Sequence, residues 1–497
     1  MFQKIILDQF ILMVEKFGSN NALCINEKLY SYSDFAQVIS KIRKALDLVE
    51  TNTTNIGLIA NDDIETYASI FALWLEGLAY VPIHPHLPIE RNAEILSQAN
   101  IDLIISSSDN DLFSNLRTIK TNDLKFEELL LLPKPTEDEA IAYILFTSGS
   151  TGKPKGVPIT RKNLCAFIQS FLNVGFNIDQ SDRCLQCFDL TFDVSVQSYL
   201  VPLIKGACIY TIPHNQIKYT YVYGLLEDHK LTFSVMTPSI LRYLRPYFDE
   251  LNIPSMKYCI ITAEACPIDL VKELSICIPN AEIFDFYGPT EATIYCTYYK
   301  FNRNSFNKHL NGMSSIGKAM NGLTAIILDE KGNELGKNQK GELCISGSQL
   351  TTGYWMNPQR TKESFFEMER EASVCRFYKT GDICYIDDEE DILYAGRLDF
   401  QVKIQGYRIE LGEIEYHARE YLKGQNTVAI SFENKSGIVE IALFVEGILT
   451  DTGIIAGYLK SKLPYYMVPT RILVIKSFPL NSNGKIDRKL LKNLILI

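Results

Sequence analysis

The sequence predicts an α/β protein with a β-rich subdomain and a small α+β domain at its C-terminal end. Through most of the chain, strand-like apolar runs alternate with segments of helical period, which is typical of a parallel sheet covered by helices. Beyond Gly312, short apolar runs stand between Gly and Asn turns and indicate β structure that ends near Leu393. The tail from Gln401 holds enough strands and helices for a compact domain of its own.

The first half of the chain predicts regular alternation. Helical period marks residues 33–48, with Ser33 placed to cap the start. The elements expected next are a strand at 56–60, a helix near 64–75, a strand at 79–83, a helix over 89–98 and a strand at 101–106. The polar segment 109–139 is expected to be an excursion and not a domain boundary.

Alternation is expected to resume after residue 160. The predicted elements are a helix over 161–172 and strands at 207–212, 231–236, 258–262 and 283–286. The β-rich part contributes strands at 324–328 and 342–346, and the tail contributes a strand, a helix near 414–421, two strands and another helix.

Composition limits the classes of function. The 497 residues, of which 46% are hydrophobic, suffice for about two to four domains with well-buried cores. A net charge of −10 argues against a nucleic-acid-binding surface, so nucleic acid is not expected as a partner. The twelve cysteines lie in apolar segments and are expected to be reduced thiols of a cytoplasmic protein. Cys184 and Cys187 form one C-x-x-C, but no second pair or nearby histidine completes a metal set.

The N-terminal segment is apolar without being a leader. Asp8 and Glu15 interrupt it and no small-residue cleavage site follows, while Ile6, Phe10 and Met13 have the spacing of an amphipathic helix. No stretch of the chain approaches the ~18 apolar residues of a membrane span, so a membrane is not expected as a partner.

The stretch 145–156 reads Leu-Phe-Thr-Ser-Gly-Ser-Thr-Gly-Lys-Pro-Lys-Gly and follows an apolar run. Its glycines let the backbone come close to a ligand, and its hydroxyls and lysines supply donors without competing carboxylates. These properties are the ones that a binding site for a polyphosphate requires. The stretch is not a Walker A loop, because Thr147 and Pro154 stand where that motif requires Gly and Ser or Thr.

Three more polar clusters stand out against the apolar framework. The first, 286–291, reads Phe-Tyr-Gly-Pro-Thr-Glu and follows a predicted strand, where sheet ends commonly face ligands. The second is 378–382, Tyr-Lys-Thr-Gly-Asp, followed by Gly-Arg-Leu-Asp at 396–399. The third, 481–485, reads Asn-Ser-Asn-Gly-Lys.

Together with the glycine-rich loop, these clusters resemble the ordered signature motifs of the adenylate-forming superfamily. That superfamily holds acyl-CoA synthetases, luciferases and the amino-acid adenylation domains of nonribosomal peptide synthesis. The resemblance covers nearly the whole chain. It implies a large N-terminal domain, residues 1–398, built from two doubly wound subdomains and a β-rich one, and a mobile C-terminal lid, residues 399–497.

The resemblance also implies roles for individual residues, with ATP and Mg²⁺ as cofactors. Thr147, Ser148, Thr151 and Lys155 would contact the β- and γ-phosphates of ATP. Tyr287 would stack on adenine, and Asp285 would accept a hydrogen bond from its amino group. The remaining positions are Thr290 at the nucleotide, Glu291 as the Mg²⁺ ligand, and Asp382 with Arg397 at the ribose.

Two further roles belong to the implied lid. Lys485 matches the lysine that bridges the reacting carboxylate and phosphate, and Asp399 stands at the hinge. After adenylation the lid would rotate about Asp399, which removes Lys485 and brings Gly406 toward a thiol. Catalysis is therefore assigned to Lys485, Glu291 and Thr151.

The stretch 188–197 is the most informative for the substrate. Its second half, Phe192-Asp193-Val194-Ser195, resembles the Phe-Asp-x-Ser of amino-acid adenylating enzymes, in which the aspartate pairs with the substrate ammonium. An acyl- or aryl-CoA synthetase has no reason to bury a carboxylate there, because an unpaired buried charge is costly. Asp193 therefore favours an amino acid over a fatty or aromatic acid.

Aligned by its motifs, the expected pocket resembles that of proline-activating domains. Its residues are Asp193, Val194, Gln197, Val235, Ile261, Ala263, Phe286, Ile294, Tyr295 and Lys485. Phe286 and Tyr295 differ from that lining by being larger aromatic residues. The smaller pocket that they would form suits a compact ring but also admits alanine of either hand or serine. D-alanine ligases of cell-wall modification share this organisation, so D-alanine is the alternative to L-proline, and an acyl- or aryl-CoA synthetase is a further one.

No carrier segment follows Ile497 and no condensation domain precedes Met1. We therefore expect a free-standing enzyme of secondary-metabolite biosynthesis that loads a separate carrier protein, on whose phosphopantetheine thiol it forms an aminoacyl thioester.

Overall fold

The computed structural model describes residues 1–49, 51, 53–108, 113, 115–125, 128–149, 152–213, 216–305, 307–370, 373–447, 451–480 and 486–495. The chain divides into two compact units. Unit 1 comprises Met1–Pro85, Leu96–Leu145 and Gly156–Leu398. Unit 2 comprises His86–Ile95, Phe146–Lys155 and Asp399–Ile497, so the glycine-rich loop groups with the C-terminal part of the chain.

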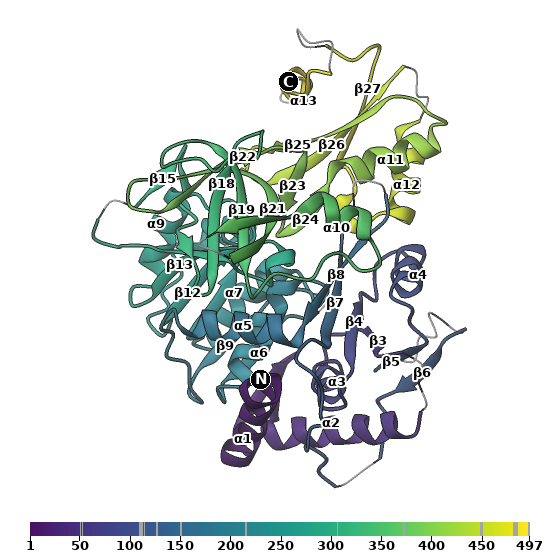
Figure 1. Ribbon diagram of the computed structural model, residues 1–497, viewed down its shortest axis with the longest axis vertical. Coiled ribbons are helices and arrows are strands. Elements are labelled where there is room, and N and C mark those ends of the chain that lie inside the picture. The colour runs from purple at the N-terminus through teal and green to yellow at the C-terminus, as the bar shows by residue number, and fades with distance from the viewer. Residues whose placement is uncertain are drawn as a thin grey trace. The chain divides into compact units, whose positions relative to one another are not determined.

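The larger sheet of unit 1 has nine strands (Figure 1). In spatial order they are β17 (Lys318–Ala319), β14 (Thr297–Lys300), β13 (Glu282–Tyr287), β12 (Tyr258–Thr262), β11 (Phe233–Met236), β9 (Arg183–Gln186), β10 (Cys208–Thr211), β1 (Asn21–Ile25) and β2 (Lys28–Ser31). The strands from β13 to β1 pair in parallel, and antiparallel strands close both edges. Carboxyl ends of parallel strands meet at one edge, so β11, β12 and β13 deliver their following residues to the same place.

A second sheet begins in unit 1 and has six strands. Their order is β6 (Arg117–Lys120), β5 (Leu103–Ser106), β3 (Asn55–Ile59), β4 (Ala79–Ile83), β7 (Ile141–Thr147) and β8 (Lys155–Thr160). The pairs among β6, β5, β3, β4 and β7 are parallel. The residues of β3 and β4 are buried throughout, as expected of strands covered on both faces. Residues 148–154, the centre of the glycine-rich loop, connect β7 to β8.

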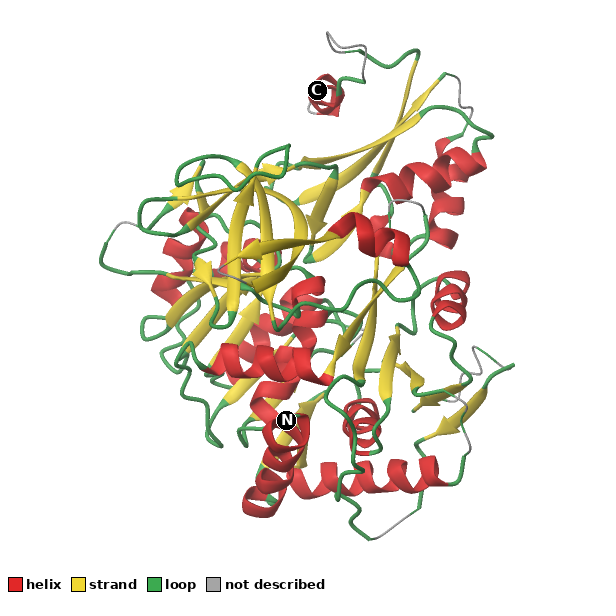
Figure 2. Ribbon diagram, viewed as in Figure 1, coloured by secondary structure: helices red, strands yellow, loops and turns green. Residues whose placement is uncertain are grey.

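Helices accompany these strands, as Figure 2 shows in red. They are α1 (Asp8–Phe17) after the π-helical turn η1 (Gln3–Leu7), α2 (Tyr32–Asp47), α3 (Ile64–Leu75), α4 (Ile89–Gln98), α5 (Arg161–Leu172), α6 (Asp193–Leu203), α7 (Lys218–Asp228), α8 (Pro238–Leu244) with the 3-10 turn η2 (Arg245–Tyr247), and α9 (Ile268–Cys277). Side chains satisfy the free backbone N–H groups at several helix starts. Thr160 and Asn163 form a capping box at α5, and Asp63 accepts from Thr66 N at α3.

The β-rich part of unit 1 is a five-stranded antiparallel sheet. It contains β18 (Leu323–Leu328), β19 (Gly341–Gly347), β21 (Ser373–Ile386), β20 (Phe365–Arg370) and β22 (Ile392–Arg397), with α10 (Pro358–Ser364) before β20. A two-stranded ribbon, β15 (His309–Leu310) and β16 (Met313–Ser314), and the 3-10 turn η3 (Thr290–Ala292) complete the unit. The sheet ends at Arg397, four residues beyond the predicted Leu393.

The C-terminal part of unit 2 is the α+β domain that its sequence predicts. Its strands are β23 (Gln401–Ile404), β24 (Tyr407–Glu410), β25 (Thr427–Glu433), β26 (Val439–Glu446) and β27 (Arg471–Ile475). Its helices are α11 (Leu411–Tyr421), α12 (Thr452–Lys462), η4 (Tyr465–Met467) and α13 (Arg488–Ile495). A small apolar core built around Phe432, Phe444 and Leu491 holds the three-stranded sheet to α13.

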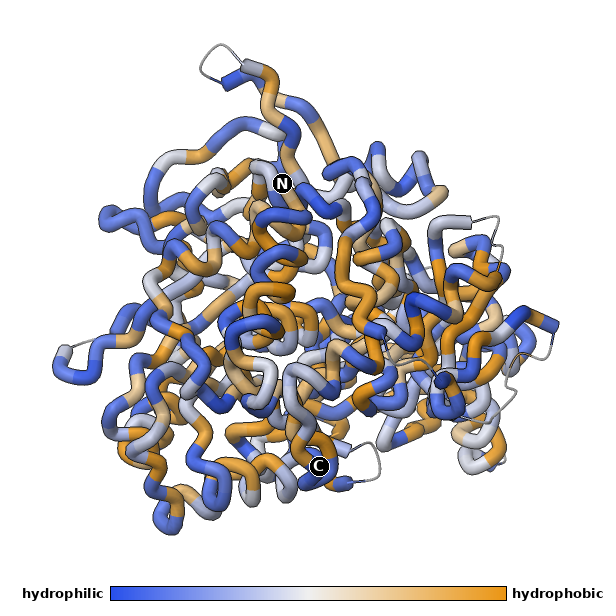
Figure 3. Tube along the Cα trace, turned by 90° about the horizontal axis from the view of Figure 1, so that it is seen from below, coloured by the Kyte–Doolittle hydropathy of each residue, from blue (hydrophilic) through white to orange (hydrophobic). Residues whose placement is uncertain are grey.

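Unit 1 has its own continuous apolar core, which includes Trp74, Phe71 and Phe10. Along the trace in Figure 3, the apolar segments in orange alternate with hydrophilic segments in blue. Within the described residues, no helix combines the length and apolarity needed to cross a membrane.

Two sequence predictions need correction. Ser33 does not cap α2. Ser31 is the cap, because Asp34 lies three residues further on and completes a capping box with it. The segment 109–139 is less of an excursion than predicted, because it contains β6, which extends the six-stranded sheet beside β5.

Candidate functional site

A hydrogen-bonded chain joins three of the predicted nucleotide residues in unit 1. Arg397 Nη1 donates to Asp382 Oδ1 over 2.6 Å, and the Tyr287 hydroxyl donates to Asp382 Oδ2. β21 and β22 pair Asp382 with Arg397, while Tyr287 ends β13 in the other sheet. Burial and then the charge of Asp382 raise the pKa of Tyr287 well above its usual range. The sequence selected these residues separately but did not predict their contact.

Glu291 lies in η3 directly after this strand and is fully buried. Its Oε1 accepts a hydrogen bond of 2.6 Å from the Tyr354 hydroxyl. The loop before it turns tightly at Gly288, where an added Cβ would lie 2.4 Å from Ile294 O and 2.6 Å from Tyr295 Cα. Only glycine fits this close approach of two backbones.

Sequence reasoning missed the segment that holds this loop. Gln349 Nε2 donates to Ala292 O over 3.2 Å and to Tyr295 O over 2.7 Å, while the Thr293 hydroxyl donates to Gln349 O. Thr351 N donates to Glu291 O over 2.9 Å. These bonds join residues more than fifty positions apart, and no local pattern in the sequence marks them.

Asp193 opens α6 and is only 5% exposed, so the carboxylate is removed from solvent at a helix N-terminus, where negative charge is favoured. Gln197 follows one turn later on the same side of the helix. Its side chain is fully buried, and neither amide atom has a hydrogen-bond partner among the described residues. Buried polar groups are normally paired, so both amide atoms are able to bond to a water molecule or to a polar ligand group.

Two tyrosines share the electrostatic surroundings of Asp193. Burial raises the pKa of Tyr295 well above its usual range, the Asp193 charge adds to this, and a contact with the Thr262 hydroxyl opposes it. Burial, Tyr80 and then Asp193 raise the pKa of Tyr143 in the same way. Tyr143 on β7 was not among the predicted site residues, although its hydroxyl is buried and has no partner in the described part of the chain.

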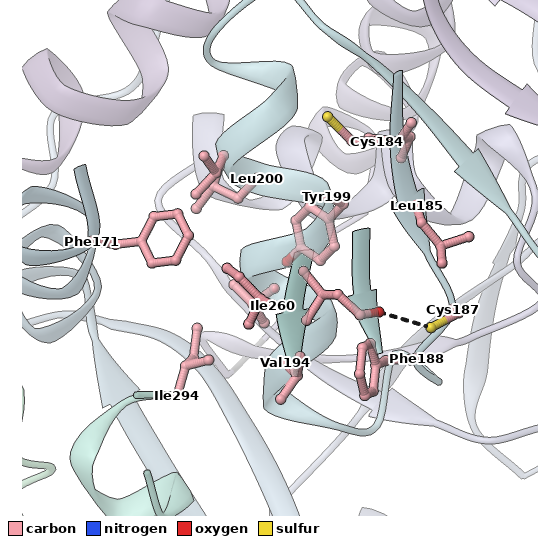
Figure 4. Packing of buried hydrophobic residues seen from close by; sticks show 14 of the residues in the cluster. Phe171, Cys184, Leu185, Cys187, Phe188, Val194, Tyr199, Leu200, Ile260 and Ile294 are labelled. Atoms are coloured by element: carbon pink, nitrogen blue, oxygen red, sulfur yellow. Dashed lines mark hydrogen bonds between the residues drawn. The ribbon is translucent and has the colours of Figure 1, made fainter. Parts of the chain in front are cut away.

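Three other predicted pocket residues are buried side chains near the ends of parallel strands. Val235 lies on β11, Ile261 on β12 and Phe286 on β13, and each is at most 1% exposed. The Phe286 and Tyr295 rings are 5.0 Å apart. Figure 4 shows Val194 and Ile294 within the same buried cluster, where the Cys187 thiol donates to Val235 O over 3.2 Å.

Two of the predicted pocket residues have left-handed backbone conformations that L-residues seldom adopt. Ala263, directly after β12, has φ of 72°, and Ile294 has φ of 75°. Such outliers persist only where surrounding structure enforces them, and they cluster at functional sites. Next to Ala263, Glu264 accepts from Ser239 N over 3.0 Å and so caps the start of α8.

Within unit 2, the glycine-rich loop interacts with an anion of the protein itself. Gly149 N donates to Glu413 Oε2 over 3.1 Å, and Arg91 Nη1 binds Glu413 Oε1 over 2.5 Å. The Ser148 hydroxyl donates to Arg408 O over 2.7 Å. A backbone N–H that binds a carboxylate oxygen is able to bind a phosphate oxygen by the same chemistry.

The structure describes some of the other residues predicted to bind phosphate or to belong to the lid. Thr147 ends β7, and its buried hydroxyl has no partner among the described residues. Lys155 starts β8 and is buried. Ser150, Thr151 and Lys485 lie outside the described residues. Asp399 is exposed, and its Oδ1 accepts from Gln401 N over 3.1 Å.

The family model of AMP-binding enzymes matches residues 13–355. The D-alanine–D-alanyl carrier protein ligase of Bacillus velezensis is 32% identical over 437 residues, which is 85% of each chain. A linear gramicidin synthase of Brevibacillus parabrevis is 30% identical over 449 residues, or 88% of the present chain. The chain spans only 8% of the length of that much longer relative.

Among solved structures, the Vibrio cholerae adenylation domain AlmE, crystallised with glycyl-adenosine-5'-phosphate, has the same fold. It superposes with a TM-score of 0.84 at 24% identity and covers 98% of this chain and 97% of its own. The mixed α/β fold with a large N-terminal and a small C-terminal domain is thereby confirmed. The chain therefore belongs to the AMP-binding enzyme family of adenylate-forming ligases.

Proposed function

We propose that the chain uses ATP to adenylate an amino acid, releases pyrophosphate, and passes the aminoacyl group to the phosphopantetheine thiol of a separate carrier protein. The observation that supports this most directly is the burial of Asp193 at the start of α6. A carboxylate in that position is stabilised by a cation, and the ammonium group of an amino acid would supply one. The carboxyl end of the substrate would then be held at a fixed distance from the ammonium site.

In the proposed adenylation, a carboxylate oxygen of the substrate attacks the α-phosphorus of ATP, and the bond to the β-phosphate oxygen breaks. Negative charge moves onto pyrophosphate, so fixed positive groups lower the barrier. Lys485 would supply one of them, and Thr147, Ser148, Thr151 and Lys155 would bind the leaving phosphates. Tyr287, Asp285 and Thr290 would hold the adenine side, and Asp382 with Arg397 would bind the ribose hydroxyls.

The donor set fits Mg²⁺ as the partner of Glu291. This carboxylate is fully buried, and Tyr354 bonds to Oε1. Mg²⁺ commonly uses one or two carboxylates together with substrate phosphates, and no cluster of three or more metal-binding side chains occurs among the described residues. When bound, the ion would offset phosphate charge, and the protein's part is to keep the Glu291 carboxylate in place.

L-Proline is the favoured substrate in this proposal, on the resemblance of the pocket to proline-activating domains. The Phe286 and Tyr295 rings, whose centroids lie 5.0 Å apart, would narrow the proposed pocket, as a compact ring requires. D-Alanine is the second candidate, because a relative named for that substrate is 32% identical over 85% of the chain. An acyl- or aryl-CoA synthetase would leave Asp193 without the substrate ammonium.

The thioester step needs a change of conformation in this proposal. Residues 399–497 would act as a lid that rotates about Asp399, exchanging Lys485 for Gly406 and its neighbours. The carrier protein as partner is supported by the relative named for a D-alanyl carrier protein. A cytoplasmic location, also proposed, suits the twelve free thiols.

Amino-acid-dependent exchange of pyrophosphate into ATP tests the proposal. Asp193→Ala and Asp193→Asn should abolish exchange, because the ammonium loses its charged partner. Ser198→Ala is the matched control on the same helix, where the hydroxyl donates to Val194 O over 3.0 Å. Full exchange by Asp193→Ala, or ATP binding by the wild type without exchange for any amino acid, would overturn the assignment.

A further inference from the structure

We propose that residues 349–355, here called the brace, position the two halves of the site at once, with Gln349 holding the amino-acid pocket and Tyr354 holding Glu291. The inference rests on the proposed function, since it names positioning residues for that reaction. Both are positioning residues, because they act through the loop 288–296 that follows β13. The brace lies between β19 and α10 and has no regular secondary structure of its own.

The Tyr354 end acts on the Glu291 carboxylate. Its hydroxyl donates to Glu291 Oε1 over 2.6 Å, and both side chains are buried. The Tyr354 ring packs edge-on against Phe365, with centroids 6.1 Å apart. A donor fixed in this way favours the rotamer of Glu291 in which Oε1 faces the Tyr354 hydroxyl.

The Gln349 end acts on the pocket wall. Its Nε2 donates to Ala292 O and Tyr295 O, which lie on either side of the strained residues Thr293 and Ile294. The Thr293 hydroxyl returns a bond to Gln349 O. Because Thr293 and Ile294 both have positive φ, their conformation depends on such external bonds.

The brace is itself tied to rigid elements. Asn163 on α5 donates to Ser348 O and Leu350 O, each over 2.9 Å, and Arg376 on β21 donates to Thr351 O and Thr352 O, each over 2.8 Å. Two further bonds reach β8. The Thr351 hydroxyl donates to Pro158 O, and Trp355 N donates to Gly156 O over 2.8 Å.

These attachments mean that Glu291 and Ile294–Tyr295 are held against one common segment. The Thr351 N bond to Glu291 O lies between the two ends and joins them. If the brace only stabilised the fold, each brace variant would be less stable, and its constants for ATP and for the amino acid would change together. A positioning role predicts that the two ends affect different constants.

Tyr354→Phe tests the first end, because it removes the hydroxyl and keeps the ring beside a cavity of about 910 Å³. Calorimetric titration with ATP should show about tenfold weaker binding in the presence of Mg²⁺, the size expected for a lost bond to a charged group. Titration in EDTA should be unchanged within twofold. Tyr32→Phe is the control, since its buried hydroxyl bonds Leu203 O and Ala207 O instead.

Gln349→Leu tests the second end by removing the amide at similar volume. We expect the KM for the amino acid in pyrophosphate exchange to rise about tenfold or more, since two buried carbonyls lose their donor. The KM for ATP should stay within twofold. Thermal unfolding of each variant reports separately whether the fold is retained.

Equal losses of ATP affinity with and without Mg²⁺ for Tyr354→Phe would overturn the inference. So would a Gln349→Leu variant in which both KM values rise together, or two folded variants with wild-type constants. These results differ from a failure of the proposed function, in which the wild type binds ATP but performs no exchange with any amino acid. The titrations need no turnover and separate the two cases.

Discussion

Arg397 Nη1 lies 2.6 Å from Asp382 Oδ1, on paired positions of two antiparallel strands, and the pair is almost completely buried. The Tyr287 hydroxyl donates a hydrogen bond to the second carboxylate oxygen of Asp382. One carboxylate thus joins the β-rich sheet to the end of β13 in the nine-stranded sheet.

Removing this carboxylate should affect stability and nucleotide binding together. Asp382→Ala leaves the Arg397 guanidinium buried without its anion, which typically costs about 3–5 kcal/mol. Urea denaturation should show the loss, and ATP titration should show at least tenfold weaker binding in the folded variant. Asp123→Ala, at an exposed position, is the control and should change neither value. A stable Asp382→Ala variant with wild-type affinity would exclude the residue from the nucleotide site.

Adding one carbon at Gly288 should distort the pocket. The Cβ of Gly288→Ala would lie 2.4 Å from Ile294 O, so the loop must shift, at a cost of about 1–3 kcal/mol for overpacking. We expect lower stability and a higher KM for the amino acid. Gly224→Ala has open space inside α7 and should stabilise by about 0.5–1 kcal/mol. If the two variants behave alike, the close approach at Gly288 does not constrain the pocket.

The thiols should be unreactive in the folded protein and should lower its stability at high pH. Eleven of the twelve cysteines are buried and Cys375 is half-buried, so a thiol reagent should modify about one thiol before denaturation. Burial raises the pKa of Cys165 and Cys187 from 9.0 to about 12. The folded state then binds more protons than the unfolded state above pH 9, and stability falls as pH rises from there toward 12. Denaturant titrations at pH 8 and at higher pH test whether the free energy of unfolding falls with pH. A rise in that free energy at the higher pH would contradict the prediction.

Lys485 provides a separate test of the lid. Lys485→Ala should raise the activation free energy of adenylation by about 3 kcal/mol or more, as the loss of other transition-state donors does. Thioester formation from supplied aminoacyl adenylate should largely survive, because in the proposed mechanism the second step would use a different lid position. Lys489→Ala on the exposed side of α13 is the control. Equal loss of both steps in Lys485→Ala would contradict a two-position lid.

Local patterns in the sequence predicted several elements, but not α6, α7 or α8. The helices at 64–75, 89–98 and 161–172 and the strands at 79–83 and 258–262 begin and end where the apolar period and the flanking residues placed them. The short strand β6 was missed, because it lies at a sheet edge and its residues are mostly exposed. Ser31 and not Ser33 caps α2, because Asp34 completes a capping box with Ser31 whereas Ala36 stands three residues after Ser33.

Contacts between distant segments could not be predicted in this way. Tyr287 and Asp382 were each selected by motif, yet they are 95 positions apart and their hydrogen bond depends on how two sheets meet. Gln349, Tyr354 and Tyr143 lie outside the signature motifs, and their buried polar atoms near Glu291 or Asp193 distinguish them in the fold. Backbone strain at Ala263 and Ile294 is likewise a property of the folded chain.

Pyrophosphate exchange with a panel of L-proline, pipecolate, D- and L-alanine, serine and glycine tests the central claim most directly. The proposal predicts exchange that depends on an amino acid, is strongest with L-proline, and is lost in Asp193→Ala. Strongest exchange with D-alanine would select the second candidate. Exchange driven by a fatty or aromatic acid, or none with any amino acid while ATP still binds, would contradict the account.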